Sequence, residues 1–545
     1  MSDNPHLHGG LLALRAIAAA EPEVDTLFTL SGGHIFPLLD AAHELDWRIV
    51  DVRHEQTAVF AAEGMAKLTR LPGIAALTAG PGVTNGVSAM TGAYLNGTPM
   101  LVLGGRAPHH RWGSGSLQEL DHIPIVSSVT KYAATANDTG AIPALVLHAL
   151  AEATAPHRGP AFIDFPLDVL GGHSELQLDA AALSDRSGAD PDESSIREAA
   201  DLIARAQRPV CVAGSDVYWA RAESELVAFA ESRRVPVFVN GLGRGTIPAD
   251  HELSVSRSRA FMKQADVVVV VGTPLDFRLS FGRFENAAVI HIVDAEERRA
   301  THAETESTIA GDLRVILERL GTVELSHDAT EHETWISRLR DEEAAKREQE
   351  RAELEADTTP IHPARVYGEL RKVLDRDAIV IGDGGDFVSY AGRLVESYQA
   401  GCFLEPGPYG CLGTGLGYAA AARLAHPTRQ VVACLGDGAF GFSGMDVDTL
   451  VRHELPVVMV VGNNGIWGLE KHPMQFFYGY DVAADLRQET RYDDIVRALG
   501  GAGETVRDPA ELGPALKRGF DSGVPYLVNV LTDPAIAYPR SSNLA

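Results

Sequence analysis

Two polar residues in the last third of the chain, Asp437 and Asn464, each follow a short β-rich run. Asp437 lies in a Gly-Asp-Gly turn after VVACL, and Asn464 lies in a Gly-Asn-Asn turn after VVMVV. Parallel α/β sheets place ligands at the carboxyl ends of their strands. Carboxylate and amide oxygens suit magnesium or calcium, and glycines let the backbone approach a diphosphate. The pair predicts a site for a metal and a diphosphate; two unrelated turns are the structural alternative.

A third polar residue, Glu55, precedes the helical pattern TAVFAAEGMAKL in the first third of the chain. A carboxylate at this place has a structural explanation, because negative charge is favourable at the N-terminus of a helix. Taken alone, a glutamate at this position is more often structural than catalytic.

Short β-rich runs alternate with helical patterns along the whole chain, which predicts parallel α/β sheets. The expected strands are Thr26–Leu30, Ile74–Thr78, Met100–Gly104, Ala161–Phe165, Pro209–Ala213, Val235–Asn240, Val267–Val271, Val289–Val293, Ile379–Ile381, Val431–Leu435, Val457–Val461 and Leu527–Leu531. We predict an α/β protein of three consecutive parallel-sheet domains, over residues 1–180, 190–345 and 360–545. Connectors are expected at about 171–193 and 326–360, the second as a solvated surface helix.

Composition excludes several classes of protein. The net charge of -27 argues against nucleic-acid binding, because no basic stripe is present to neutralise phosphates. The four cysteines are widely spaced, which predicts reduced thiols rather than disulfides or a zinc site. The chain shows neither an apolar run of membrane-spanning length nor a signal-peptide pattern at its start. We therefore expect a cytoplasmic protein that acts on a small molecule, with no membrane partner.

The metal and diphosphate pattern resembles that of the thiamine-diphosphate enzyme superfamily, in which GDG is followed by NN. The segments RHEQTAVFAAEGMAKL and TAGPGVTN in the first third are also similar to that superfamily. The resemblance implies thiamine diphosphate and Mg²⁺ as cofactors. It also implies a pyrimidine-binding domain, a central domain and a diphosphate-binding domain, in that order. Glu55 would then hydrogen-bond the aminopyrimidine ring.

The resemblance assigns further residues by position. The metal ligands would be Asp437, Asn464 and the main-chain oxygen of Ile466. The remaining residues expected at the cofactor are Pro81, Asn85, Gly384, Asp386, Leu412, Gly436, Gly438, Ala439, Trp467 and Gly468. Leu412 would wedge between the two cofactor rings, with ordinary core packing as the alternative. His34 and Gln118 resemble substrate-facing positions, although a lone histidine is as often a structural residue.

Within the superfamily, the chain most resembles the group of acetolactate synthases and 2-hydroxyacyl-CoA lyases. Acetolactate synthases typically carry a Gln-Trp-Gln motif after the metal loop, but Pro473 stands where its Trp would be. Glu470 instead resembles the proton-shuttling glutamate of the bacterial lyases. A surface glutamate paired with Lys471 or another neighbour is the alternative for this residue.

The central domain shows no set of residues whose types and spacing indicate a catalytic site. The resemblance implies ADP, CoA or FAD there, and Arg259, Arg278 and Asp294 are the candidate nucleotide residues. Arg540, in the C-terminal segment, resembles the basic tail that closes over a thioester. A purely structural central domain is the alternative.

From this resemblance we predict cleavage of a 2-hydroxyacyl-CoA to formyl-CoA and an aldehyde or ketone. Glu55 would activate the aminopyrimidine, and Glu470 would remove and return the substrate proton, typically worth about 10² to 10⁴ in rate. The alternatives are an acetolactate-synthase-like condensation of 2-keto acids and a non-catalytic cofactor-fold subunit. A homodimer is the expected minimum and a homotetramer the expected form, because the superfamily's cofactor lies between two subunits.

Overall fold

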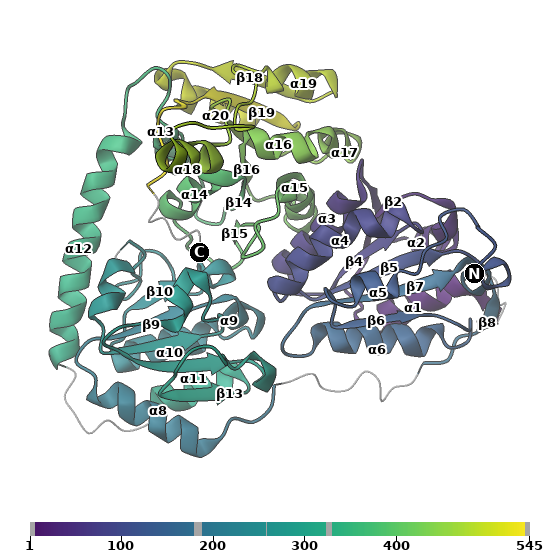
Figure 1. Ribbon diagram of the computed structural model, residues 1–545, viewed down its shortest axis with the longest axis horizontal. Helices are drawn as coiled ribbons and strands as arrows, with labels where there is room; N and C mark the ends of the chain where they lie inside the picture. Colours follow the sequence, from purple (N-terminus) through teal and green to yellow (C-terminus); the bar gives the residue numbers. More distant parts are fainter. Residues whose placement is uncertain (1–5, 179–187, 258, 323–329, 540–545) are drawn as a thin grey trace.

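The computed structural model describes residues 6–178, 188–257, 259–322 and 330–539. It contains three α/β units, each built around a parallel sheet with helices on its faces (Figure 1). The predicted fold class is confirmed. Strands such as β11 (Val267–Val271) are buried along their whole length, as strands covered on both faces must be.

The N-terminal unit has a six-stranded sheet in the order β3-β2-β4-β5-β7-β6. Its strands are β2 (Thr26–Leu30), β3 (Arg48–Asp51), β4 (Gly73–Leu77), β5 (Met100–Arg106), β6 (Tyr132–Thr135) and β7 (Pro160–Pro166). Its helices are α1 (Gly9–Ala20), α2 (Phe36–Glu44), α3 (Glu55–Thr69), α4 (Pro81–Leu95), α5 (Ile123–Val126), α6 (Ile142–Thr154) and α7 (Leu167–Leu170). A separate antiparallel pair joins β1 (His6–His8) to β8 (His173–Glu175).

The central unit has a five-stranded sheet in the order β10-β9-β11-β12-β13. Its strands are β9 (Pro209–Ala213), β10 (Val237–Val239), β11, β12 (Ala288–Val293) and β13 (Ser307–Ala310). Its helices are α8 (Glu193–Arg205), α9 (Ser215–Trp219), α10 (Glu223–Arg233) and α11 (Leu313–Thr322).

The C-terminal unit has a six-stranded sheet in the order β15-β14-β16-β17-β19-β18. Its strands are β14 (Ile379–Asp383), β15 (Phe403–Leu404), β16 (Val431–Gly436), β17 (Val458–Asn463), β18 (Ala502–Val506) and β19 (Tyr526–Leu531). Its helices are α13 (Pro363–Val373), α14 (Gly385–Leu394), α15 (Thr414–Ala425), α16 (Asp437–Ser443), α17 (Val447–Arg452), α18 (Gly468–Tyr478), α19 (Tyr492–Ala498) and α20 (Leu512–Asp521). The strand order changes direction between β14 and β16, and ligands bind at such a switch point in open α/β sheets.

A long helix, α12 (Thr330–Leu354), runs along the edge of the molecule from the central unit to the C-terminal unit (Figure 1). The charged stretch expected as a connector helix is thus helical. It is not fully solvated, because Trp335, Ile336 and Leu339 are buried in the core of the central unit. The other expected connector, about 171–193, contains β8 and the start of α8, so part of it is regular structure.

Every strand expected from the sequence is present, although β10 is shorter than predicted. The strands that were not predicted are short or lie at sheet edges, so the hydrophobic runs that would reveal them are short or weak. They are β1, β3, β6, β8, β13, β15 and β18.

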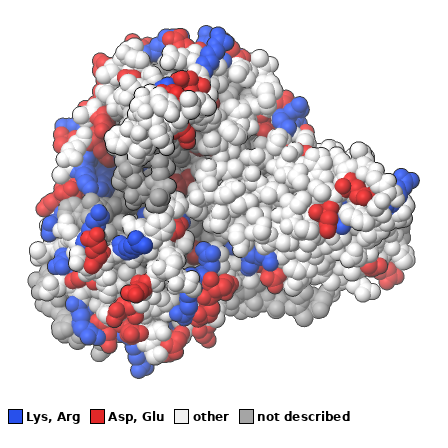
Figure 2. All heavy atoms as spheres, in the orientation of Figure 1, with Lys and Arg blue, Asp and Glu red and all other residues white. Residues whose placement is uncertain are grey.

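In the described part of the chain, no helix is long and apolar enough to cross a membrane. The four cysteines are all unpaired, as predicted. Charged side chains gather over the central and C-terminal units, whereas the face of the N-terminal unit seen in Figure 2 carries few of them.

Candidate active site

A cavity lies at the carboxyl ends of β14, β16 and β17, at the switch point of the C-terminal sheet. Its wall includes most of the predicted diphosphate and metal residues: Gly384, Asp386, Gly436, Asp437, Gly438, Ala439, Asn464, Ile466, Trp467 and Gly468. The parallel strands end at one edge of the sheet, so residues far apart in the chain meet there. Glu470, from the first turn of α18, also lines this cavity.

Asp437 is the most enclosed charged group in this wall. Its Oδ2 accepts a hydrogen bond of 2.7 Å from the Gly465 amide, and its Oδ1 accepts one of 2.9 Å from the Gly438 amide. Burial raises the pKa of Asp437 to about 6 in spite of these donors. A divalent cation would compensate the buried carboxylate. The amide oxygen of Asn464 lies on the neighbouring loop, and carboxylate, amide and main-chain oxygens are the donor set that Mg²⁺ takes.

Two helices begin at the cavity, α14 at Gly385 and α18 at Gly468. Their free amide groups and positive dipole ends favour an anion such as a diphosphate. Glycine is required at Gly384, where φ is 90°, and a Cβ there would lie 2.4 Å from the Ala439 side chain. The wall therefore fits the diphosphate group of thiamine diphosphate and the divalent metal ion that accompanies it. Asp386 is less simply explained, because its carboxylate lies against Gly468 and would repel an anion.

Glu470 is exposed at the rim of the cavity. Glu470 does not pair with Lys471, whose Nζ binds Asp485 at 2.6 Å and Asp481 at 3.1 Å. Glu470 makes no ion pair with any described residue. Its carboxylate is thus available to a ligand in the cavity.

The predicted residues of the first third form a second cluster, in the N-terminal unit. Glu55 is the first residue of α3 and is buried, with 8% of its surface exposed. Asn85 Nδ2 donates a hydrogen bond of 3.0 Å to Glu55 Oε2, and Pro81 begins the helix that carries Asn85. The structure thus brings Glu55, Pro81 and Asn85 together.

His34 and Gln118 lie in this same cluster. The Gln118 side chain lies beside His34, and burial lowers the pKa of that imidazole. Gln118 has a φ of 57°, a left-handed conformation that is uncommon outside glycine and frequent at functional sites. Nδ1 of His34 is buried and has no partner among the described residues.

The two clusters are separate within one chain. The described wall of the C-terminal cavity contains no residue of the N-terminal unit, and Leu412 does not line it either. The main-chain oxygen of Leu412 accepts a hydrogen bond of 3.3 Å from Gln56, next to Glu55. Helices α3 and α15 pack closely between the units, and Asp446 accepts hydrogen bonds of 2.7 Å from the Arg53 amide and the Thr57 hydroxyl.

Among the residues predicted for a nucleotide, the structure describes the side chains of Asp294 and Arg278, and each pairs with another side chain. Asp294 follows β12 but binds Nδ1 of His157 at 3.1 Å, and Asp216 lies 3.5 Å from the same nitrogen. Arg278 pairs with Asp276. The side chain of Arg259 and the whole of Arg540 lie outside the described residues.

Several residues around these sites were not predicted. They are His122, Asp164 and Arg106 beneath the Gly80–Pro81 turn, Asp446 at the start of α3, and Asp383 below the Gly413 loop. All act through tertiary contacts between distant segments, so no local spacing reveals them. The positive φ of Gln118 was equally invisible in the sequence.

Comparisons with known proteins agree with this arrangement. Residues 13–125, 196–320 and 383–530 match the N-terminal TPP-binding, central and C-terminal TPP-binding domains of the thiamine pyrophosphate enzymes. "Acetolactate synthase large subunit IlvG" of Mycobacterium tuberculosis is 52% identical over 99% of this chain and 98% of its own length. "2-hydroxyacyl-CoA lyase 2" of Homo sapiens is 33% identical over 88% of this chain and 82% of its own. The chain belongs to the thiamine pyrophosphate enzyme family and is an enzyme of carbon–carbon bond chemistry.

Proposed function

We propose that this enzyme condenses 2-keto acids with loss of carbon dioxide, the acetolactate synthase reaction. The observation that carries the proposal is similarity along nearly the whole chain to mycobacterial proteins of that name, at 52% identity. The similarity to 2-hydroxyacyl-CoA lyases is weaker, at 31 to 33%. The comparisons therefore favour the reaction that the sequence analysis placed second.

Each cluster has a separate task in this proposal. Asp437, Asn464 and the main-chain oxygen of Ile466 hold Mg²⁺, and the amide groups at the starts of α14 and α18 hold the diphosphate. When bound, thiamine diphosphate would supply the electron sink that decarboxylation of a 2-keto acid requires. Glu55 holds or releases a proton at the aminopyrimidine ring, and Asn85 keeps its carboxylate in place.

A second copy of the chain would bring the two clusters together. Large apolar side chains are exposed beside both clusters: Phe36 and Leu117 on the N-terminal unit, and Phe442 and Met445 on the C-terminal unit. The face of the N-terminal unit that carries few charges in Figure 2 suits such a contact. We propose at least a homodimer, acting in a reducing compartment such as the cytoplasm.

The test is an assay of purified protein with thiamine diphosphate, Mg²⁺ and pyruvate, with products identified by mass. Acetolactate and carbon dioxide are the expected products. Absence of both, together with cleavage of a 2-hydroxyacyl-CoA, would overturn the proposal.

Cleavage of 2-hydroxyacyl-CoA is the second candidate, and specific observations favour it. Glu470 lines the cavity without an ion-pair partner, and Pro473 lies within α18 where the synthases carry a tryptophan. A larger cavity of about 630 Å³, the volume of a small-molecule site, lies along a neighbouring stripe of α14. Asp386 and Tyr390 of this helix face the first cavity, whereas Ser389 and Arg393 line the second.

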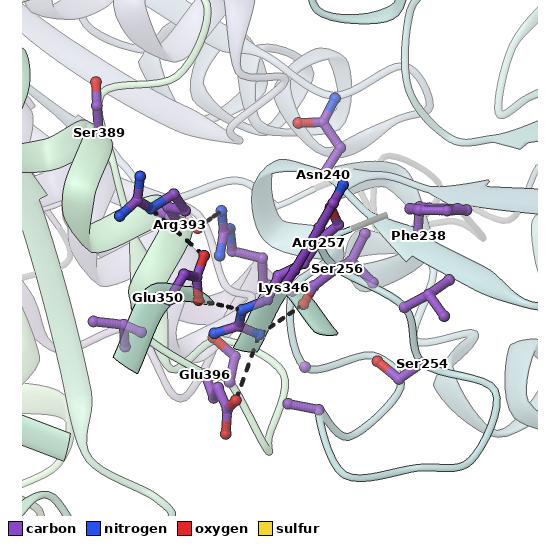
Figure 3. A pocket seen from close by; sticks show the side chains of 18 of the residues that line it. Phe238, Asn240, Ser254, Ser256, Arg257, Lys346, Glu350, Ser389, Arg393 and Glu396 are labelled. Atoms are coloured by element: carbon purple, nitrogen blue, oxygen red, sulfur yellow. Dashed lines mark hydrogen bonds and ion pairs between the residues drawn. The ribbon is translucent and has the colours of Figure 1, made fainter. Parts of the chain in front are cut away.

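The larger cavity lies between the central unit, α12 and the C-terminal unit (Figure 3). Arg257 and Arg393 reach it but share Glu350, as the dashed lines in Figure 3 show. Arg244 donates to the Gly392 main-chain oxygen at 2.6 Å, and no described carboxylate forms an ion pair with it. A guanidinium without an ion-pair partner among the described residues suits a phosphate group of CoA. Formyl-CoA released from a 2-hydroxyacyl-CoA, and its loss in Arg244→Gln, would establish this candidate.

A further inference from the structure

A fully buried histidine, His122, lies beneath the turn that leads into α4. Its Nε2 is 3.0 Å from the main-chain nitrogen of Gly80, and its Nδ1 is 3.0 Å from Oδ2 of Asp164. The Gly80 amide can only donate, so Nε2 must accept and the ring proton must lie on Nδ1. The imidazole is thus neutral, with one tautomer selected by its two partners.

The carboxylate that orients this histidine is itself held in place. Asp164 is fully buried in β7, and Arg106 of the neighbouring strand β5 donates a hydrogen bond of 2.8 Å to its Oδ2. The guanidinium of Arg106 also binds Asp121 and lies over the ring of Trp112. A buried carboxylate with a cationic partner is compensated, so this group can orient an imidazole without moving.

The turn above His122 is one that only glycine forms readily. Gly80 has φ 60° and ψ -112°, and an added Cβ would lie 3.0 Å from the Gln118 side chain. The amide that His122 binds is therefore in a conformation that needs external support.

The same turn fixes the surroundings of Glu55. Pro81 and Gly82 follow Gly80 as the first turn of α4, and the position of a Gly82 Cβ lies 3.7 Å from Glu55 Oε1. One turn further, Asn85 donates its hydrogen bond to Glu55 Oε2. A shift of the Gly80 turn would therefore move Asn85, which binds the Glu55 carboxylate, and the Gly82 backbone beside it.

We propose that His122 is a positioning residue for Glu55: it accepts the Gly80 amide hydrogen bond and so holds the first turn of α4 against the Glu55 carboxylate. Asp164 and Arg106 set its tautomer and orientation. This inference rests on the proposed function only in that Glu55 is the acid that serves the cofactor. It does not depend on which substrate the enzyme takes.

The two nitrogens of His122 can be tested separately. In His122→Gln the amide group falls near the place of Nε2, so the contact with Gly80 can be kept while that with Asp164 is lost. In His122→Asn the amide falls near Nδ1, so the contact with Asp164 is kept while that with Gly80 is lost. The two variants are matched controls, because each removes the ring and retains one amide.

The first measurement is amide hydrogen exchange of peptides covering residues 78–86, in the protein without cofactor. We expect His122→Asn to exchange about 3- to 10-fold faster than wild type there, as for loss of one hydrogen bond, and His122→Gln to stay within about 2-fold. Equal exchange in wild type and His122→Asn would overturn the proposal. So would equal acceleration in both variants, since ring packing alone would then support the turn.

The second measurement is the rate at which the C2 proton of bound thiamine diphosphate exchanges with solvent. We expect about a 10-fold slower exchange in His122→Asn with cofactor affinity within about 3-fold of wild type, and near-normal exchange in His122→Gln. Glu55→Gln serves as the reference. If Glu55→Gln slows exchange but His122→Asn does not, the positioning role is wrong; if Glu55→Gln leaves it unchanged, the assignment of Glu55 itself fails.

Discussion

Asn85 and Glu55 join the first turns of two helices: the Asn85 side-chain amide donates a hydrogen bond of 3.0 Å to Oε2 of the Glu55 carboxylate. The bond leaves Oε1 without a hydrogen-bond partner among the described residues and fixes the direction in which the carboxylate can reach a cofactor. A buried acid held in this way is suited to proton transfer at a fixed atom.

Glu55→Gln should lower turnover by about 10² to 10⁴, because the amide cannot exchange the proton. Binding of thiamine diphosphate should stay within a few-fold of wild type, since the diphosphate and metal groups lie in the other cluster. Steady-state rates and a cofactor titration measure the two effects. Glu511→Gln, a surface substitution, is the control, and a Glu55→Gln enzyme with full activity would contradict the assignment.

Asp437→Asn should weaken Mg²⁺-dependent cofactor binding by about 10²-fold or more, because it removes the anionic ligand while keeping the size of the side chain. The Trp467 ring packs against Gly438, so its fluorescence should report binding directly. Titration of thiamine diphosphate with and without Mg²⁺ gives the affinities. Asp508→Asn, at a surface turn, should bind as wild type does, and unchanged affinity in Asp437→Asn would place the metal elsewhere.

Glu470→Gln separates the two candidate reactions. With 2-keto acids we expect a change of less than about 3-fold, because the proposed condensation assigns no step to this carboxylate. With a 2-hydroxyacyl-CoA we expect about a 10²-fold loss, as for removal of a general base. Steady-state rates of wild type and Glu470→Gln, measured in parallel on both substrates, test this expectation. A large loss of rate on pyruvate would show that Glu470 also serves the condensation.

Asp383 should make stability depend on pH. Burial raises the pKa of Asp383 to about 7 from an ordinary value of 3.8, although the amides of Gly413 and Gly415 donate hydrogen bonds to it. Between about pH 4 and 7 the folded protein therefore holds a proton that the unfolded chain has released, so stability falls as pH rises through this window. The Tm advantage of wild type over Asp383→Asn should shrink from pH 5 to pH 8. A constant Tm difference would contradict this expectation.

A buried ion pair within α3 is hydrogen-bonded to Tyr418 of the C-terminal unit. Lys67 Nζ lies 2.8 Å from Glu63 Oε1, and the Tyr418 hydroxyl of α15 donates to Glu63 Oε2 at 2.7 Å. Lys67→Met should destabilise the protein by about 3 to 5 kcal/mol, because the Glu63 charge stays buried without its cation. Glu63→Gln combined with Lys67→Met should recover part of the loss. Thermal unfolding of the single and double variants measures the coupling, and simple additivity would show that the pair does not interact.

The fold was largely predictable from the sequence, because β-rich runs such as Val267–Val271 are long, continuous and bounded by glycine. The cofactor wall was predictable for a related reason: Asp437 and Asn464 directly follow strands, and parallel strands bring their ends together. The residues that position Glu55 were not predictable. His122 and Asp164 lie far from Glu55 in the chain and act on it only through the Gly80 turn. Local motifs also did not determine the reaction. Glu470 and Pro473 favour cleavage of a 2-hydroxyacyl-CoA, whereas similarity along the whole chain favours the condensation of 2-keto acids.

The helix α12 decides how the central unit could be prepared on its own. Trp335 donates to the Pro209 main-chain oxygen, and His332 binds the Ala206 and Arg233 main-chain oxygens, so this helix completes the hydrophobic core of the central sheet. A fragment ending at residue 322 would lack Trp335 and Leu339. The apolar side chains of the central unit that these two residues cover would then be exposed to water, and the fragment would be expected to aggregate. A fragment ending after Leu354 would retain them, so the smallest unit able to fold independently extends through the helix that resembles a linker in the sequence.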